Sequence, residues 1–148
     1  MVEISEVKYR SIVSDFRVID GDTIELWLDL GFTIKFSLTM RLLGYDAPER
    51  SHKDPVHKAA GQVVHDAVTT WMNLAAQYTM YYHSYEFDKY GRVMGDLVSV
   101  TFGSLLEYLK GNKMVKAVTS TGKRPDWSQD DLHSIIHNPY RAPAPMNA

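Results

Sequence analysis

Five side chains in three short segments of the sequence could together cut an ester of phosphoric acid. Three are carboxylates (Asp22, Asp46 and Glu49) and two are guanidinium groups (Arg41 and Arg92). Carboxylate oxygens are the ligands that hard cations such as Ca²⁺ prefer. The planar fork of arginine can donate paired, charge-assisted hydrogen bonds to phosphate oxygens. This combination of residue types predicts metal-assisted chemistry on an anionic phosphodiester.

Each of the three segments also has an ordinary structural interpretation. Asp20-Gly21 is typical of a tight hairpin, residues 46–49 (Asp-Ala-Pro-Glu) fit a strand that enters a proline turn, and residues 88–92 (Asp-Lys-Tyr-Gly-Arg) fit a hairpin loop. For any one segment, the structural interpretation is the commoner one. Asp22, however, follows the first turn and Asp46 follows the third predicted strand, so both carboxylates are expected at one rim of a small barrel. The joint occurrence of the segments indicates a site.

Periodic patterns predict the elements that must position these side chains. Alternation of β-branched or aromatic residues with polar ones predicts five strands, over residues 7–19, 23–30, 32–43, 78–87 and 92–101. Apolar residues at three- and four-residue steps predict a helix from Ala60 to about Gln77, and shorter helices are expected over residues 104–110 and 128–136. This order favours an α+β fold: a five-stranded OB-type Greek-key β-barrel with a helix after strand 3 and short C-terminal helices.

Length and composition point to one domain without cysteine chemistry. The chain has 148 residues, 45% of them hydrophobic, and we expect a single domain over residues 1–140 and a disordered tail over 141–148. There is no cysteine, so oxygen or imidazole nitrogen must bind any metal ion. The first residues include acids and no long apolar run. This pattern argues against a signal peptide and against a membrane-spanning helix at the start of the sequence. A cytoplasmic location is therefore expected, although a trimmed secretory precursor would look the same.

The charge distribution argues against binding nucleic acid through overall charge. The formal net charge is −2, so phosphate binding has to be local. Residues 110–124 contain five basic residues and no acid, which fits either a local phosphate-binding surface or an ordinary solvated one. His133 and His137 lie one helical turn apart and could bind zinc, but no third ligand is near in sequence, so a solvated helix face is expected.

Four segments, in their content and order, resemble the staphylococcal (micrococcal) nuclease or thermonuclease family. They are residues 18–24 (Val-Ile-Asp-Gly-Asp-Thr-Ile), 41–49 (Arg-Leu-Leu-Gly-Tyr-Asp-Ala-Pro-Glu), 61–62 (Gly-Gln) and 88–95 (Asp-Lys-Tyr-Gly-Arg-Val-Met-Gly). The resemblance extends from about residue 7 to residue 117. The family cuts single-stranded and double-stranded DNA and RNA with little sequence preference and leaves 3′-phosphates. The resemblance implies this activity and these substrates.

The resemblance also implies a calcium site beside a catalytic carboxylate. Asp22 and Asp46 would bind Ca²⁺ directly, with the main-chain carbonyl of Ala47 as a further ligand. Glu49 would orient or deprotonate the attacking water. DNA or RNA is the expected partner; no membrane partner and no small-molecule cofactor is expected, and the protein is expected to be a monomer.

Four further positions would hold the substrate by the same resemblance. Arg41 and Arg92 would bind the scissile phosphate and stabilise its growing charge, and Arg92 is the better candidate for the leaving oxygen because it stands on a separate turn. Lys89 and Tyr90 would contact a terminal phosphate and the nearby sugar. The alternative is a non-catalytic nuclease-like OB-fold module that binds nucleic acid or protein. Such members usually lose the acids or the arginines, which are all present here.

The chain departs from the family pattern in two places. Between Thr23 and Arg41 the hairpin is longer than in the best-known member. After about Val118, the long C-terminal helix and the aromatic pair that flanks the nucleotide are not recognisable. Basic and aromatic residues stand there instead: Lys116, Lys123, Arg124 and Trp127. These residues would either contact the nucleotide or cover the barrel.

Overall fold

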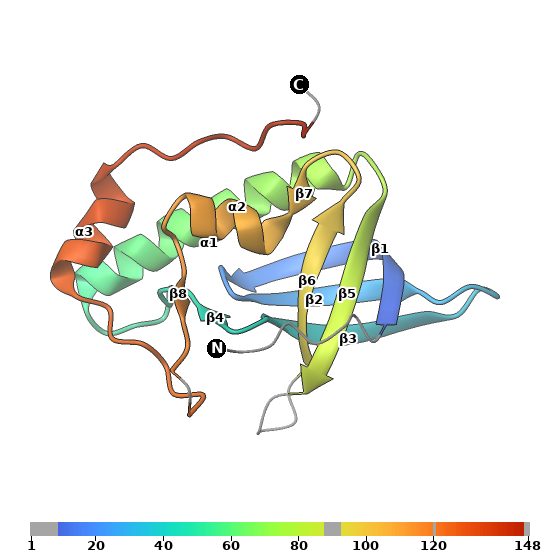
Figure 1. Ribbon diagram of the computed structural model, residues 1–148, viewed down its shortest axis with the longest axis horizontal. Helices are drawn as coiled ribbons and strands as arrows, with labels where there is room; N and C mark the ends of the chain where they lie inside the picture. The colour runs from blue at the N-terminus through green and yellow to red at the C-terminus, as the bar shows by residue number, and fades with distance from the viewer. Residues whose placement is uncertain (1–8, 88–92, 120, 147–148) are drawn as a thin grey trace.

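The structure is a computed structural model that describes residues 9–87, 93–119 and 121–146 (Figure 1). In this part of the chain, five strands form a closed barrel: β1 (Tyr9–Asp20), β2 (Thr23–Asp29), β3 (Lys35–Leu42), β5 (Met80–Phe87) and β6 (Val93–Ser99). Three helices lie against it: α1 (Pro55–Ala75), α2 (Leu105–Gly111) and α3 (Gln129–His137). None of these helices has the length and apolar content needed to span a membrane. The predicted α+β fold, an OB-type barrel with a helix after strand 3, is confirmed.

Strand pairing explains how residues far apart in sequence reach one rim of the barrel. Antiparallel pairing joins the strands in the order β3-β2-β1-β5-β6, and a parallel pairing of residues 40–42 with residues 93–95 closes the barrel. Along β2, Ile24, Leu26 and Leu28 are buried while the residues between them stay partly exposed. This period-two burial is the pattern that the sequence predicted for a strand with one face on the core.

Helix α1 begins at Pro55 rather than at the predicted Ala60. The carboxylate of Asp54 accepts a hydrogen bond from the backbone N–H of Val56 (3.3 Å), and proline stands in the first turn, where its missing N–H is not needed. The Asp-Pro pair therefore starts the helix. The predicted start at Ala60 was too late, because the apolar periodicity appears only in the second turn.

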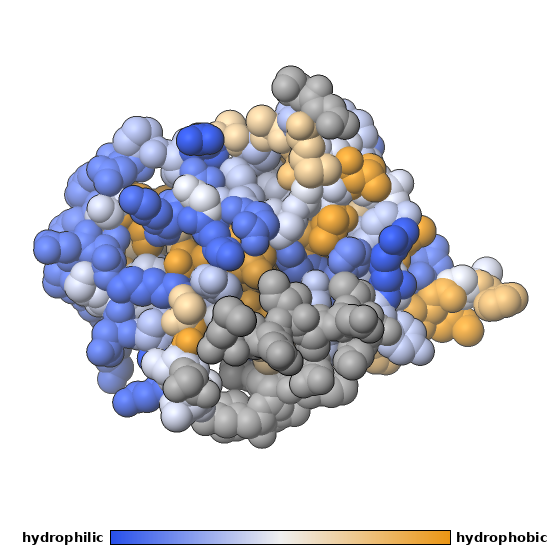
Figure 2. Space-filling view, viewed as in Figure 1, coloured by the Kyte–Doolittle hydropathy of each residue, from blue (hydrophilic) through white to orange (hydrophobic). Residues whose placement is uncertain are grey.

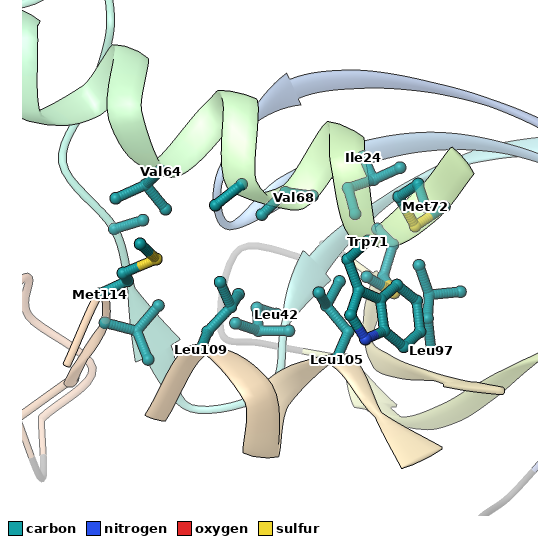
Figure 3. Packing of buried hydrophobic residues seen from close by; sticks show 14 of the residues in the cluster. Ile24, Leu42, Val64, Val68, Trp71, Met72, Leu97, Leu105, Leu109 and Met114 are labelled. Atoms are coloured by element: carbon teal, nitrogen blue, oxygen red, sulfur yellow. The ribbon is translucent and has the colours of Figure 1, made fainter. Parts of the chain in front are cut away.

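The core lies between α1, α2 and the barrel (Figure 3). Trp71 of α1 lies beside Leu105 of α2 and Leu97 of β6, and Leu109 of α2 lies near Leu42 of β3; all five are at most 2% exposed. Burial of each such side chain contributes roughly 1.5–3 kcal/mol before entropy is subtracted. This packing holds α1 firmly over the rim where β2 begins and β3 ends.

Short pairings attach the C-terminal segment to the barrel. Strand β4 (Tyr45–Asp46) pairs with β8 (Lys116–Ala117), and β7 (Gly103–Ser104) pairs with the end of β6. Helix α3 starts with the predicted capping box and packs on α1. The β4–β8 pairing, which the sequence analysis missed, places the chain after Lys116 next to Asp46.

The segment predicted to be a disordered tail follows a defined path as far as residue 146. The backbone N–H of Arg141 donates a hydrogen bond to Oδ1 of Asn112 (2.8 Å). The backbone N–H of Met146 donates one to the carbonyl of Thr101 (2.9 Å). These bonds hold residues 141–146 extended along the side of the molecule that carries α2 (Figure 1).

The β2–β3 hairpin projects from the barrel. Strand β3 begins at Lys35 and not at the predicted residue 32, because Gly31, Phe32 and Thr33 all have positive φ angles, outside the extended region. Figure 2 shows apolar side chains gathered at this tip. The exposed apolar residues there are Leu30, Phe32, Ile34 and Phe36.

Candidate active site

Two glycines let three segments meet beneath the candidate site. A Cβ added to Gly21, in the β1–β2 turn, would lie 2.3 Å from Cγ1 of Val64 on α1. A Cβ added to Gly61 of α1 would lie 2.5 Å from the carbonyl carbon of Glu49. Any side chain at either position would force these segments apart. The glycines therefore allow the turn, the loop after β4 and helix α1 to approach closely enough to form one site.

Asp22 is buried and held by its neighbours. The residue is only 2% exposed. Oδ2 accepts a hydrogen bond from the backbone N–H of Ala47 (2.9 Å), and Oδ1 accepts one from the hydroxyl of Thr23 (2.9 Å). The carbonyl of Asp22 accepts a third from the N–H of Leu42 (2.9 Å). These contacts fix the carboxylate against the loop that follows β4.

Asp46 is equally buried, at 2% exposed, but has fewer partners. Its Oδ2 accepts a hydrogen bond from the indole N–H of Trp127 (2.9 Å). Its Oδ1 is buried without any hydrogen-bond partner. Because an unpaired buried oxygen is unfavourable, Oδ1 is the atom in this site that most needs a cation.

Arg41, near the end of β3, stands between the two carboxylates. Its Nη2 lies 3.6 Å from Oδ2 of Asp22 and 3.6 Å from Oδ1 of Asp46, and its side chain is 15% exposed. Both distances exceed hydrogen-bond length, so the contacts are ion pairs. The structure therefore brings Asp22, Asp46 and Arg41 together at one rim of the barrel.

The pKa of Asp46 reflects the crowding of charge. Its pKa is raised from the ordinary 3.8 to about 6: burial is the largest cause and the charge of Asp22 adds to it, against the lowering effects of the Trp127 hydrogen bond and the charge of Arg124. A carboxyl with a raised pKa beside a second carboxylate is typical of functional sites. A bound cation would remove the repulsion that causes part of this shift.

Arg124 is the residue that the sequence analysis did not place in the catalytic set. Its Nε lies 3.3 Å from Oδ1 of Asp46, and its Nη1 forms an ion pair with Oε1 of Glu49. The Arg124 side chain is 50% exposed, and that of Glu49 is 25% exposed. The C-terminal segment thus supplies both a cation and, through Trp127, a hydrogen-bond donor to the site. The sequence signals for it were the basic run at residues 110–124 and the presence of Arg124 and Trp127 where the family pattern ends.

Asp22 and Asp46 offer a hard cation two carboxylates, and other oxygens would have to complete its shell. Among the described residues, no group of three or more His, Cys, Asp or Glu side chains is arranged to hold a metal ion. The unpaired Oδ1 of Asp46 beside the carboxylate of Asp22 gives two acidic ligands. Calcium accepts backbone carbonyls and water as further ligands, so the carbonyl of Ala47 and water would have to supply the rest.

The proposed zinc pair does not gain a third ligand. His133 and His137 are exposed, and their rings stack with centroids 5.7 Å apart. No metal-binding group that includes them occurs in the described ranges. The expected solvated helix face is the arrangement that the structure has.

Three of the candidate residues cannot be compared with the structure. Lys89, Tyr90 and Arg92 lie outside the described residues. The chain resumes at Val93, which pairs with Met40, one residue from Arg41. The roles expected for the three residues therefore stay predictions.

A groove with a volume of about 380 Å³ leads away from the site. Its lining includes Asp46 and Glu49, the start of α1 and the C-terminal segment. His52 and His57 line it with their rings stacked, 3.8 Å between centroids. Arg124 and Trp127 also line it. The groove has the size of a small-ligand site, and its flat side chains suit a nucleobase or sugar.

Comparison with known proteins does not identify the chain. Its sequence matches no family model and no curated protein. The site geometry and the motifs therefore carry the functional interpretation.

Proposed function

We propose that the chain is a calcium-dependent phosphodiesterase that hydrolyses DNA or RNA strands with little sequence preference and leaves 3′-phosphates. The observation that carries the proposal is the pair of buried carboxylates, Asp22 and Asp46, with the guanidinium of Arg41 between them. Burying two like charges together destabilises a protein unless a cation compensates them. The nearby guanidinium groups do so only partly: Arg41, 3.6 Å from each carboxylate, and Arg124, 3.3 Å from Asp46, are two cations beside three carboxylates, because Arg124 also pairs with Glu49.

Asp22, Asp46 and the carbonyl of Ala47 would hold the ion. Calcium would supply positive charge to the phosphoryl oxygens of the substrate and to a bound water. Asp22 is the better-anchored ligand because its carboxylate already accepts two hydrogen bonds. Oδ1 of Asp46 accepts no hydrogen bond and contacts only the guanidinium groups of Arg41 and Arg124 among the described residues, so it is the oxygen that would turn to the ion.

Arg41 and Glu49 would act on the substrate beside the ion. Arg41 presents a guanidinium whose contacts to carboxylates are long, so its N–H groups can turn to phosphate oxygens. Glu49 is only partly exposed and lies on the groove, where it can orient water or accept its proton. Arg92 is proposed to stabilise the leaving oxygen.

A non-catalytic nucleic-acid-binding module is the second candidate. The ion pair between Glu49 and Arg124 favours it, because a carboxylate held by a guanidinium is a weaker base. The two candidates differ in whether the site hydrolyses the bound nucleic acid.

Cleavage of plasmid and single-stranded DNA and of RNA, with calcium or with excess chelator, tests the proposal. We expect calcium-dependent cleavage that Asp46→Asn abolishes. Asp130→Asn, an exposed aspartate on α3, is the matched control and should keep full activity. Binding without cleavage in any metal would support the second candidate, and full activity in chelator would refute the metal assignment.

A further inference from the structure

Arg124 reaches the candidate site from the segment between Thr119 and Asp126, whose backbone is held by contacts near both ends. At its start, the backbone N–H of Thr119 donates a hydrogen bond to the carbonyl of Lys123 (2.9 Å). At its end, the ammonium of Lys116 donates to the carbonyl of Asp126 (2.9 Å) and forms an ion pair with Asp131. The backbone is therefore anchored, whereas the half-exposed Arg124 side chain can change its position.

Arg124 occupies the place in which a metal ion would find its ligands. Its Nε faces Oδ1 of Asp46, the buried oxygen without a hydrogen bond, and its Nη1 contacts Glu49. The guanidinium is charged at every physiological pH. A divalent cation bound to Oδ1 would meet a like charge a few ångströms away, so the two cations must compete for the same carboxylate.

A guanidinium displaced from Asp46 has a second group of partners within reach. Arg124 lines the groove that leads from the site, and its side chain is 50% exposed there. Arg41, the other cation described at the aspartates, is only 15% exposed and is not among the residues that line the groove. A guanidinium in such a groove is suited to bidentate contact with a phosphate oxygen pair.

Two contacts hold Asp46 independently of Arg124. Trp127 donates its indole N–H to the other oxygen, Oδ2 (2.9 Å). Asp46 also belongs to β4, which pairs with Lys116 of β8. One carboxylate oxygen is thus anchored and the other can change partner.

We propose that Arg124 is a further substrate-binding residue of this site, which neutralises Asp46 and Glu49 in the metal-free protein and moves to a phosphate of the nucleic acid when a divalent cation takes its place. The inference rests on the proposed function. It deepens that function by assigning a phosphate contact to the segment after residue 118.

The first measurement is cation affinity without nucleotide. Tb³⁺ is titrated into the protein and detected by luminescence that the adjacent indole of Trp127 sensitises, and Ca²⁺ affinity follows by competition. Arg124→Ala should bind both ions at least about fivefold more tightly, the usual scale of coupling between competing groups. Lys123→Ala removes the same charge one residue away; the contacts described for Lys123 are those of its main chain with Thr119, so its affinity should stay that of the unmodified protein.

The second measurement is nucleotide affinity at saturating Ca²⁺. Adenosine 3′,5′-bisphosphate is titrated by calorimetry into the same proteins and into Arg124→Lys. Arg124→Ala should weaken binding by about tenfold or more, the loss expected for one charge-assisted hydrogen-bonded contact. Arg124→Lys should recover part of it, because lysine restores the charge without the fork. Circular dichroism and melting temperature verify that each variant is folded.

The outcomes separate this inference from the proposed function. The inference is supported if Arg124→Ala, and not Lys123→Ala, binds the cations more tightly and the nucleotide more weakly than the unmodified protein does. If the unmodified protein binds neither Tb³⁺ nor Ca²⁺, the proposed function fails and the inference fails with it. If it binds both ions but Arg124→Ala keeps the affinity of the unmodified protein in either measurement, the inference alone is overturned.

Discussion

Replacing Asp46 by asparagine should make the metal-free protein more stable while removing its metal site. Asp46→Asn keeps the shape of the side chain and retains an oxygen that can accept the indole N–H of Trp127. It removes a charge that is buried beside Asp22. Functional residues often reduce the stability of the folded state in this manner.

The expected gain follows from the raised pKa of Asp46. Its pKa rises from 3.8 to about 6 on folding, and each unit corresponds to about 1.36 kcal/mol. Ionising Asp46 in the folded protein therefore costs about 3 kcal/mol relative to the unfolded chain. A neutral asparagine avoids this cost. For a domain of this size, about 3 kcal/mol raises Tm by roughly 6–12 °C.

The direction of the pKa shift fixes how the stability difference between the two proteins changes with pH. Because the folded pKa lies above the unfolded one, the stability that Asp46 contributes is fully present below pH 3.8 and is lost as the pH rises through about 6. Asp46→Asn should therefore differ little from the unmodified protein at pH 4 and be more stable by the full amount at pH 7.5.

Urea unfolding in excess chelator at both pH values measures the difference. Asp130→Asn is the control for loss of an exposed carboxylate and should change little at either pH. Calcium should then stabilise the unmodified protein and not Asp46→Asn, since only a ligand bound by the folded state shifts the equilibrium. Equal or lower stability of Asp46→Asn at pH 7.5 would refute the reasoning, because it would mean that Arg41 and Arg124 already compensate the buried charge.

Three further predictions concern turnover. Calcium should support DNA cleavage and magnesium should support it poorly, because few carboxylates and flexible waters suit the larger ion; equal rates with the two ions would contradict this. Arg41→Lys and Arg92→Lys should each lower kcat by about 10²-fold or more, since a point charge does not replace a bidentate fork; an unchanged kcat would mean that the arginine is only a surface charge. Glu49→Gln should lower kcat by roughly 10²–10⁴-fold in a folded protein. Calorimetry should show little change in its calcium affinity, and a comparable loss of calcium binding would instead place Glu49 among the metal ligands.

Most of the barrel was predictable because its signals are local. Period-two patterns located the strands, and burial of Ile24, Leu26 and Leu28 on β2 follows that pattern. The ends of elements were less predictable. Positive φ angles at Phe32 and Thr33 shortened β3, and no propensity rule places such residues in that conformation.

The meeting of Asp22, Asp46 and Arg41 was predictable for a related reason. Each stands at the end of a predicted strand, and Thr23 pairs with Arg41 in the β2–β3 hairpin. Hairpin register brings such positions together once the strands are located. The close approach of α1 was indicated only by Gly21 and Gly61, whose importance appears when the segments are packed.

The contribution of Arg124 and Trp127 could not be predicted, because it depends on contacts between distant parts of the chain. The hydrogen bond from Trp127 to Asp46 spans 81 residues, and it relies on a two-residue pairing of β4 with β8 that has no periodic signature. The segment after residue 118 lacks the family pattern, yet it supplies a donor to Oδ2 and a cation to Oδ1 of the same carboxylate. Both oxygens of the buried Asp46 side chain thus find a partner in this segment, one a hydrogen-bond donor and the other a positive charge. Compensating a buried carboxylate is favourable, and this is a physical reason, independent of any motif, for the segment to pass along the rim before it continues into α3.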